Sequence, residues 1–275
     1  LGRYHLYFAH HQGKFIRLAY ADALAGPWTV YEPGVLHLDD TPYGAHLASP
    51  DVHIDHERRR FFMYYHGCRP MGGLQYPGGQ TGCYAESEDG LTFTSYADNC
   101  GPPYMRVFEW DGWFYSFSGG GARVLHRCPE RDGLFAPGPT LDVSGESFTD
   151  METHGRDDPQ ATPVYRMRHV CVHRRGARLH IYVSNAGDRP ERIRRTTVDL
   201  SQPWTEWCGT PLEEVLRSEM GYEGVSAPLV ASEGGASHVP VHQVRDPHVY
   251  QEGDDTYLVY SVAGERGLAI ARISE

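Results

Sequence analysis

The stretch SPDVHIDHERRRFFMYYHG, residues 49–67, places an aspartate beside a proline, just before an apolar run that alternates like a strand. The stretch RDPHVYQEGDDTYLVYSVAG, residues 245–264, repeats this arrangement near the other end of the chain. Further runs rich in Tyr, Phe, Val and Ile recur between turns of Gly, Pro, Asp and Asn. The pattern predicts an all-β protein.

These runs form a repeat when Phe61, Leu179 and Thr256 are set level. A step of ten residues back from each position reaches Asp51, His169 and Asp246. Units start near residues 50, 104, 164 and 245, and a fifth unit covers residues 1–34 without its first strand. Units of about 50 residues with three or four strands predict one five-bladed β-propeller domain over residues 1–275. A two-sheet sandwich is the alternative fold, but it would not explain the constant place of the polar residue.

The repeat also predicts where a site would lie. The first strand of each propeller blade lines the central axis, so we expect Asp51, His169 and Asp246 around one central pocket. One short helix is expected between the fourth and fifth blades, in TPLEEVLRSEMG at residues 210–221. Thr210 can cap this helix, Glu213 completes a capping box, and Gly221 ends it.

The charge of the chain argues against two classes of partner. The formal net charge is -11 at pH 7 and the pI is near 5.8, whereas nucleic acids and anionic membranes attract clustered Lys and Arg. The basic run in GDRPERIRR, residues 187–195, is interrupted by Glu191 and is interpreted as a solvated strand or turn. No stretch approaches the roughly 18 apolar residues of a membrane span.

The cysteines and the first residues bear on the compartment. Six cysteines show neither CxxC pairing nor zinc-type spacing, which favours free thiols in a reducing compartment and a cytoplasmic protein. The chain begins at Leu1 with almost no lead into its first strand, so we infer that residues before Leu1 are missing. A signal peptide and secretion therefore stay open. The sequence does not indicate an oligomeric state.

Four short motifs resemble the five-bladed propeller glycosidases, the superfamily of arabinanases, β-xylosidases, invertases and levansucrases that includes glycoside hydrolase family 43. They are RDPHV at 245–249, SPDVHID at 49–55, YEG at 222–224 and LAYADALAGPW at 18–28. The resemblance implies a bacterial-type glycoside hydrolase of carbohydrate metabolism. Its base motif belongs to the first blade in that superfamily, so either the blades are permuted here or the first-blade acid precedes Leu1.

The resemblance also implies roles for individual residues. Asp246 matches the base motif, Asp51 suits either aspartate role, and Glu223 resembles the residue that protonates the leaving oxygen. His169 matches a histidine that holds water or a structural Ca²⁺ on the propeller axis, and no other cofactor is implied. Because RDP most resembles the arabinanase motif, inversion of the anomeric centre is expected.

Three further residues complete the candidate substrate site, with a structural alternative for each. His53 and His248 lie two positions beyond an aspartate and so face the same way in a strand. They contact either substrate hydroxyls or structural partners. Arg106 begins an inner strand and binds either a substrate hydroxyl or carboxylate, or a buried ion-pair partner.

Two other classes of function compete with glycoside hydrolysis. Cleavage of a glycosidic bond needs one protonated and one ionised carboxyl, which clustered Asp51, Asp246 and Glu223 would supply. A noncatalytic carbohydrate-binding propeller needs only aromatic rings and polar groups that bind hydroxyls. A lyase or isomerase that uses His and Tyr in the same pocket is the third alternative. All three imply a carbohydrate or glycoside small molecule as ligand.

Overall fold

The computed structural model describes residues 2–69, 79–96, 98–119, 123–146 and 166–274. The chain divides into two compact units, which are described separately below. Unit 1 comprises Leu1–Val107 and Cys128–Ala136, and unit 2 comprises Phe108–Arg127 and Pro137–Glu275. The predicted single domain over residues 1–275 therefore stays a prediction.

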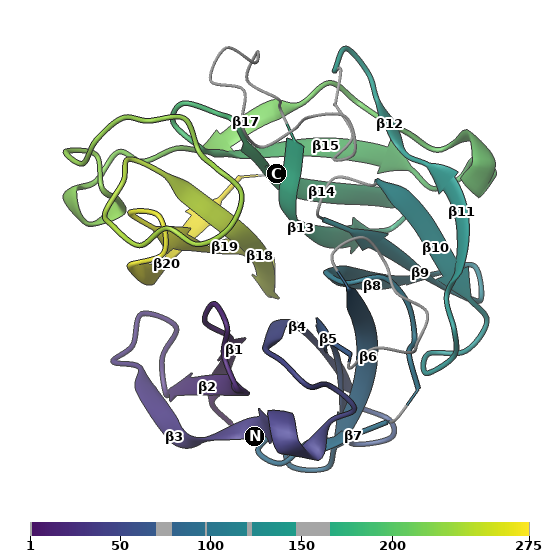
Figure 1. Cartoon of the computed structure of the whole chain (residues 1–275). Helices are drawn as coiled ribbons and strands as arrows, with labels where there is room; N and C mark the ends of the chain where they lie inside the picture. Colours follow the sequence, from purple (N-terminus) through teal and green to yellow (C-terminus); the bar gives the residue numbers. More distant parts are fainter. Residues whose placement is uncertain (1, 70–78, 97, 120–122, 147–165, 275) are drawn as a thin grey trace. The chain divides into compact units, whose positions relative to one another are not determined.

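The fold is an all-β, five-bladed β-propeller, which confirms the predicted fold class. The described residues form five sheets with 20 strands in chain order, coloured from purple to yellow in Figure 1. In the described part of the chain the helices are three 3-10 turns, Leu38–Asp40, Trp204–Glu206 and Gly221–Glu223. No helix among the described residues is long and apolar enough to cross a membrane.

The strands of the first three sheets follow one another along the chain. The first sheet has the order β1 (Tyr4–Phe8), β2 (Phe15–Ala21) and β3 (Thr29–His37). The second contains β4 (Leu47–Asp55), β5 (Arg60–Cys68), β6 (Gln80–Ser87) and β7 (Thr94–Ser95). The third contains β8 (Met105–Trp110), β9 (Trp113–Ser118), β10 (Val124–Cys128) and β11 (Ala136–Thr140).

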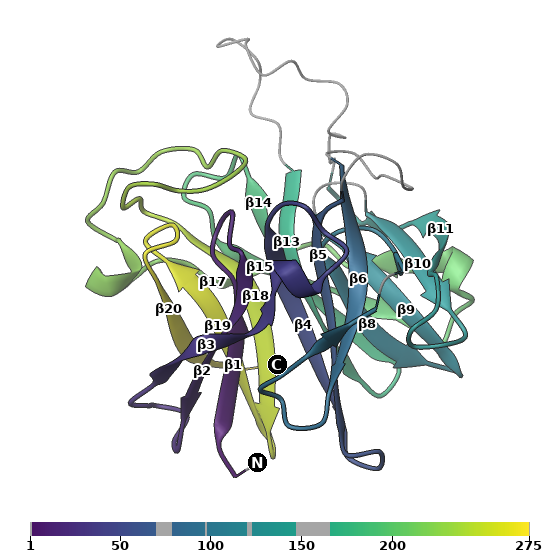
Figure 2. The same cartoon turned by 60° about the horizontal axis from the view of Figure 1, so that its bottom comes forward.

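The last two sheets belong to unit 2. The fourth contains β12 (Asp142–Val143), β13 (Arg166–Arg175), β14 (Arg178–Ala186), β15 (Ile193–Asp199), β16 (Cys208–Gly209) and β17 (Glu213–Leu216). The short β12 joins it out of chain order by pairing parallel to β16. The fifth contains β18 (Val244–Glu252), β19 (Asp255–Val262) and β20 (Gly267–Ile273), which Figure 2 shows from a second side.

Apolar strands buried on both faces build the core of each unit. In unit 1, Phe61, Met63 and Tyr65 of β5 pack with Ile16 and Leu18 of β2. In unit 2, one core cluster includes Phe108, Tyr115, Phe117, Ile181, Val183 and Trp207. Each fully buried apolar side chain stabilises the fold by about 1.5–3 kcal/mol.

The helix predicted over residues 210–221 is wrong. Residues Glu213–Leu216 form strand β17, which pairs antiparallel with β15, and Glu213 forms an ion pair with Arg195 across that pairing. The Thr210 hydroxyl accepts a hydrogen bond from the Thr197 backbone instead of capping a helix. Sheet pairing therefore overrides the local helix signal.

A glutamate carboxylate does cap a turn in this region, as in one half of a capping box, but the turn lies further along the chain. This is the 3-10 turn Gly221–Glu223, with Met220 at the N-cap. The Glu223 carboxylate accepts hydrogen bonds from the backbone N–H groups of Glu219 and Met220.

Three inner strands carry a β-bulge at the same place. The pairing register shifts by one residue between Ala48 and Asp51 in β4, between Met167 and Val170 in β13, and between Arg245 and His248 in β18. The first bulge residue has a positive φ in two of these strands, 52° at Ser49 and 56° at Asp246, and a proline follows each. Bulges redirect side chains and are common next to active sites.

The bulges correct the predicted alignment of the repeats. Counted from the bulge, Asp246 corresponds to Ser49 and to Arg168, whereas Asp51 corresponds to His248. The reason is turn length, because Asp55 pairs with Arg60 across the four residues 56–59 while the turn of the β18–β19 hairpin holds only residues 253–254. An alignment anchored on the second strand therefore moves Asp51 by two positions.

Candidate functional site

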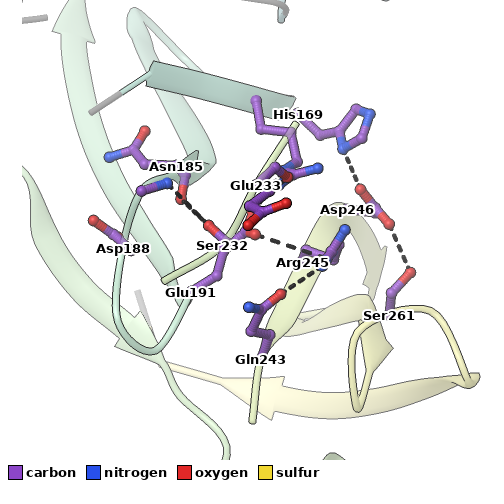
Figure 3. A network of polar contacts seen from close by, with 12 residues as sticks. His169, Asn185, Asp188, Glu191, Ser232, Glu233, Gln243, Arg245, Asp246 and Ser261 are labelled. Carbon is purple, nitrogen blue, oxygen red and sulfur yellow. Dashed lines mark hydrogen bonds and ion pairs between the residues drawn. The ribbon is translucent and has the colours of Figure 1, made fainter. Parts of the chain in front are cut away.

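Asp246 and His169 meet in unit 2. His169 Nδ1 contacts Asp246 Oδ1, and the Ser261 hydroxyl donates a hydrogen bond to Asp246 Oδ2 at 2.8 Å (Figure 3). His169 comes from β13, Asp246 from the bulge of β18 and Ser261 from β19. The predicted proximity of Asp246 and His169 is thus present in the structure.

The surroundings of Asp246 keep its carboxyl ionised. Burial alone would raise the pKa of Asp246, but the charge and hydrogen bond of His169 lower it, together with the charge of Arg245 and the hydrogen bond from Ser261. The net effect is a pKa well below the ordinary value. The Asp246 side chain remains 31% accessible; Oδ1 itself is buried, and Oδ2 has a second lone pair for a further donor. Asp246 can therefore accept a proton or bind a hydroxyl.

Asp51 forms a second carboxylate cluster in unit 1. His53 Nε2 lies 3.0 Å from Asp51 Oδ2, and the Val107 backbone N–H donates to the same oxygen at 2.9 Å. Asp51 is buried, which by itself raises its pKa, but His53, the charge of Arg106 and the Val107 N–H lower it well below the ordinary value. The Arg106 guanidinium also donates to the carbonyl oxygens of Ser49 and Met105. His53 and Arg106 therefore both have structural partners within the protein, as the alternative to substrate binding requires.

Glu223 lies in unit 2 with both carboxylate oxygens occupied. Oε2 accepts from the Glu219 and Met220 N–H groups at 2.7 and 2.9 Å, and Oε1 accepts from the Tyr260 hydroxyl at 2.5 Å. The residue is only 4% exposed. The bond to Glu223 raises the pKa of Tyr260, after the larger contribution from burial of the phenol.

Strand β19 holds the partners of both Asp246 and Glu223. Ser261 binds Asp246, and the preceding Tyr260 binds Glu223. Consecutive side chains of a strand point to opposite faces. Asp246 and Glu223 therefore contact opposite faces of β19. Glu223 can donate a proton to a substrate only after its hydrogen bond with Tyr260 breaks.

Sequence reasoning missed several residues of this region. Tyr260 and Ser261 lie in the stretch TYLVYSVAG and Arg245 in the motif RDPHV, but the sequence predicts no contact for any of the three. The signal for Ser261 is its place in the hairpin, because it pairs with Arg245 at the edge of the bulge. His248 is exposed on β18.

The described residues do not fit a calcium site at His169. Its neighbour is one carboxylate, whereas Ca²⁺ takes six to eight oxygen ligands. No group of three or more His, Cys, Asp or Glu in the described part of the chain could hold a metal ion. All six cysteines are free, as the sequence predicted, and only Cys208 is exposed.

No protein-family model matches the chain. It is 34% identical over 281 residues to the "Uncharacterized protein R118" of Acanthamoeba polyphaga mimivirus, and the match covers 97% of this chain and 75% of that protein.

Solved structures share the fold at low sequence identity. An exo-1,5-α-L-arabinanase from a bovine ruminal metagenomic library has a TM-score of 0.61 at 12% identity, covering 98% of this chain and 89% of its own. A GH43 β-xylosidase/α-arabinofuranosidase from a compost metagenome, solved with xylotriose, has a TM-score of 0.62 at 11% identity. The match covers 100% of this chain and 88% of that enzyme. A GH43_1 enzyme from Xanthomonas citri has a TM-score of 0.62 at 14% identity, and the match covers 99% of this chain and 84% of that enzyme.

Proposed function

This chain belongs to the same family as the mimivirus protein, and we propose that it is a glycoside hydrolase-like enzyme. The proposal is supported by its fold, which is that of the arabinanase and the xylosidase above. Its substrate would be a carbohydrate or a glycosylated small molecule. The observation that carries the proposal is the Asp246 carboxylate, which is held ionised by His169 and Ser261 and stays partly accessible.

In this proposal Asp246 is the base or the nucleophile. As base it takes a proton from water while the water attacks the anomeric carbon, and the leaving oxygen gains a proton from a second carboxyl. Glu223 is the proposed donor, on the condition that its carboxylate first takes up a proton and that Oε1 exchanges the Tyr260 hydroxyl for the leaving oxygen. Inversion remains the proposed stereochemical outcome.

The test is Asp246→Asn, assayed on a panel of aryl furanosides and pyranosides beside a melting curve. Loss of base catalysis is expected to lower kcat/KM by about 10²- to 10⁴-fold in a folded protein. Asp254→Asn is the matched control, because Asp254 is an exposed aspartate in the turn of the same hairpin. A folded Asp246→Asn variant with full activity would refute the assignment, and a wild type inactive on every glycoside would favour the noncatalytic binding module.

A lyase or isomerase is the second candidate function, and the contact between His169 and Asp246 favours it. A carboxylate that binds one imidazole nitrogen orients the ring, so the other nitrogen can take or give a proton. Under this proposal His169 moves the proton and no water enters the product. Reaction in ¹⁸O-labelled water separates the two proposals, since a hydrolase incorporates the label and a lyase or isomerase does not.

A further inference from the structure

Each member of the His169 and Asp246 pair directly follows a buried arginine. Arg168 precedes His169 in β13 and Arg245 precedes Asp246 in β18, and the two arginines are 7% and 2% exposed. The two strands lie side by side in unit 2, as both views show (Figures 1 and 2).

One carboxylate lies between the two arginines. Arg168 Nε is 3.0 Å from Glu191 Oε1, and Arg245 Nε is 3.7 Å from Glu191 Oε2. Glu191 has no exposed surface. This corrects the interpretation of residues 187–195 as a solvated strand or turn, because the acid that interrupts the basic run is fully buried.

The backbone reinforces the same bridge. The Glu191 carbonyl oxygen accepts a hydrogen bond from the Val244 N–H, next to Arg245. The Gly235 carbonyl oxygen accepts from Arg168 Nη1 at 3.0 Å and from Arg245 Nη1 at 3.4 Å. Both arginines therefore share two partners, the Glu191 carboxylate and the Gly235 carbonyl oxygen.

The arginines would repel each other without the carboxylate. Arg245 has additional acceptors in Gln243 and Glu265, at 2.5 and 2.9 Å. Figure 3 shows Arg245 and Gln243 beside Asp246. Arg168 has the carbonyl oxygens of Glu233 and Gly235. Glu191 is the one charge that both guanidinium groups share among the ion pairs of the described residues.

We propose that Glu191 is a positioning residue that holds Arg168 and Arg245 together, so that the neighbouring His169 and Asp246 keep their contact. Glu191 acts through the two arginines and not on a substrate. The inference about the contact stands on geometry alone, and its effect on turnover rests on the proposed function.

The direct test is Glu191→Gln, which keeps the shape of the side chain and removes its charge. The readout is the pH titration of the His169 imidazole followed by ¹⁵N NMR, with the signal assigned through His169→Gln. We expect the titration in Glu191→Gln to move towards that of Asp246→Asn, because the imidazole loses its carboxylate. A folded Glu191→Gln protein whose His169 titrates as in the wild type would overturn the inference.

The control is Glu213→Gln, which removes an exposed carboxylate that also pairs with an arginine in unit 2. Its His169 titration is expected to match the wild type. If Glu191→Gln does not fold, Glu265→Gln replaces it, since this variant removes the charge at Arg245 Nη1 from a partly exposed position. A shift in the same direction supports the inference, and an unchanged titration contradicts it.

Activity separates the inference from the proposed function. Misplacing a catalytic group by about 1 Å costs about 10²-fold, so kcat is expected to fall by about that factor in Glu191→Gln, with KM little changed. A wild type without glycosidase activity would count against the proposed function, while the NMR titration would still decide the role of Glu191.

Discussion

Asp51 and Asp246 each contact an imidazole, yet the second group that holds each carboxylate differs. Asp51 Oδ2 is fixed by the Val107 backbone N–H, whereas Asp246 Oδ2 accepts from the Ser261 side chain. A bond to the backbone ties Asp51 to the strand that follows its own sheet. Asp51 is therefore expected to contribute to stability, and Asp246 to chemistry.

Asp51→Asn should lose stability in a way that depends on pH. The pKa of Asp51 is lowered in the folded protein, so the unfolded state binds a proton first, near its ordinary pKa of about 3.9. The stability from Asp51 is fully present above that pH and is lost as pH falls towards the lowered folded pKa. The Tm gap between wild type and Asp51→Asn is expected to be wide at pH 6 and to narrow below about pH 4. A gap that widens in acid would contradict the prediction.

Glu223→Gln should affect stability and turnover together. The carboxylate caps the 3-10 turn with charge-assisted bonds, which are stronger than neutral ones, so we expect a loss of about 1–2 kcal/mol in denaturant unfolding. If Glu223 also supplies the proton, kcat falls by about 10²- to 10⁴-fold on a good aryl substrate. Tyr260→Phe serves as the comparison, since it removes the hydroxyl bound to Oε1 and leaves the carboxyl in place. Reduced stability with full activity would limit Glu223 to a cap.

At the scale of single elements, the sequence predicted strands better than their registers. The apolar runs FFMYY and TYLVY predicted β5 and β19 correctly, because most residues of both strands are buried, on both faces of the sheet. The bulges and the four-residue turn at residues 56–59 leave no periodic signal, so the position of Asp51 in the repeat was misplaced. The burial of Glu191 was not predictable either, since acids are normally exposed and its two arginines come from distant strands.

Gly138 in β11 illustrates a constraint on one element. A Cβ at this position would lie 2.0 Å from the Trp204 ring, and Trp204 also packs on the Arg127 guanidinium at 4.1 Å. Gly138→Ala must therefore displace a ring that already packs against Arg127. We expect a loss of about 1–3 kcal/mol in urea unfolding. Gly221→Ala, where a Cβ meets nothing within 4 Å, should change stability by less than about 0.5 kcal/mol. Equal stability of the two variants would contradict this packing.

At the scale of the whole molecule, the repeat sufficed to predict the fold. Five similar units without intervening helices leave few all-β architectures, and the five sheets follow the predicted units. The candidate site was only partly predictable, because the contact of His169 with Asp246 joins β13 to β18, and the sequence places four further strands, β14 to β17, between them. The YEG motif made Glu223 a candidate residue, but the sequence did not predict its hydrogen bonds to Tyr260 and to the backbone.

The predicted single domain can be tested by unfolding. Four of the five tryptophans, Trp110, Trp113, Trp204 and Trp207, belong to unit 2, so tryptophan fluorescence reports mainly on that unit. Far-UV circular dichroism reports on the strands of both units. If the chain is one cooperative domain, the two probes give the same midpoint in urea. A fluorescence transition displaced from the dichroism transition would show two independently folding domains.

The four-residue turn at 56–59 has a practical consequence for anyone who labels this protein. It lies at the end of the β4–β5 hairpin opposite the bulge that carries Ser49, and its extra residues leave the pairing from Asp51 to Asp55 regular. The number of residues in this turn therefore does not affect the strand pairing at Asp51. A fluorophore or affinity tag spliced between His56 and Arg59 would report on the protein without disturbing the cluster around Asp51.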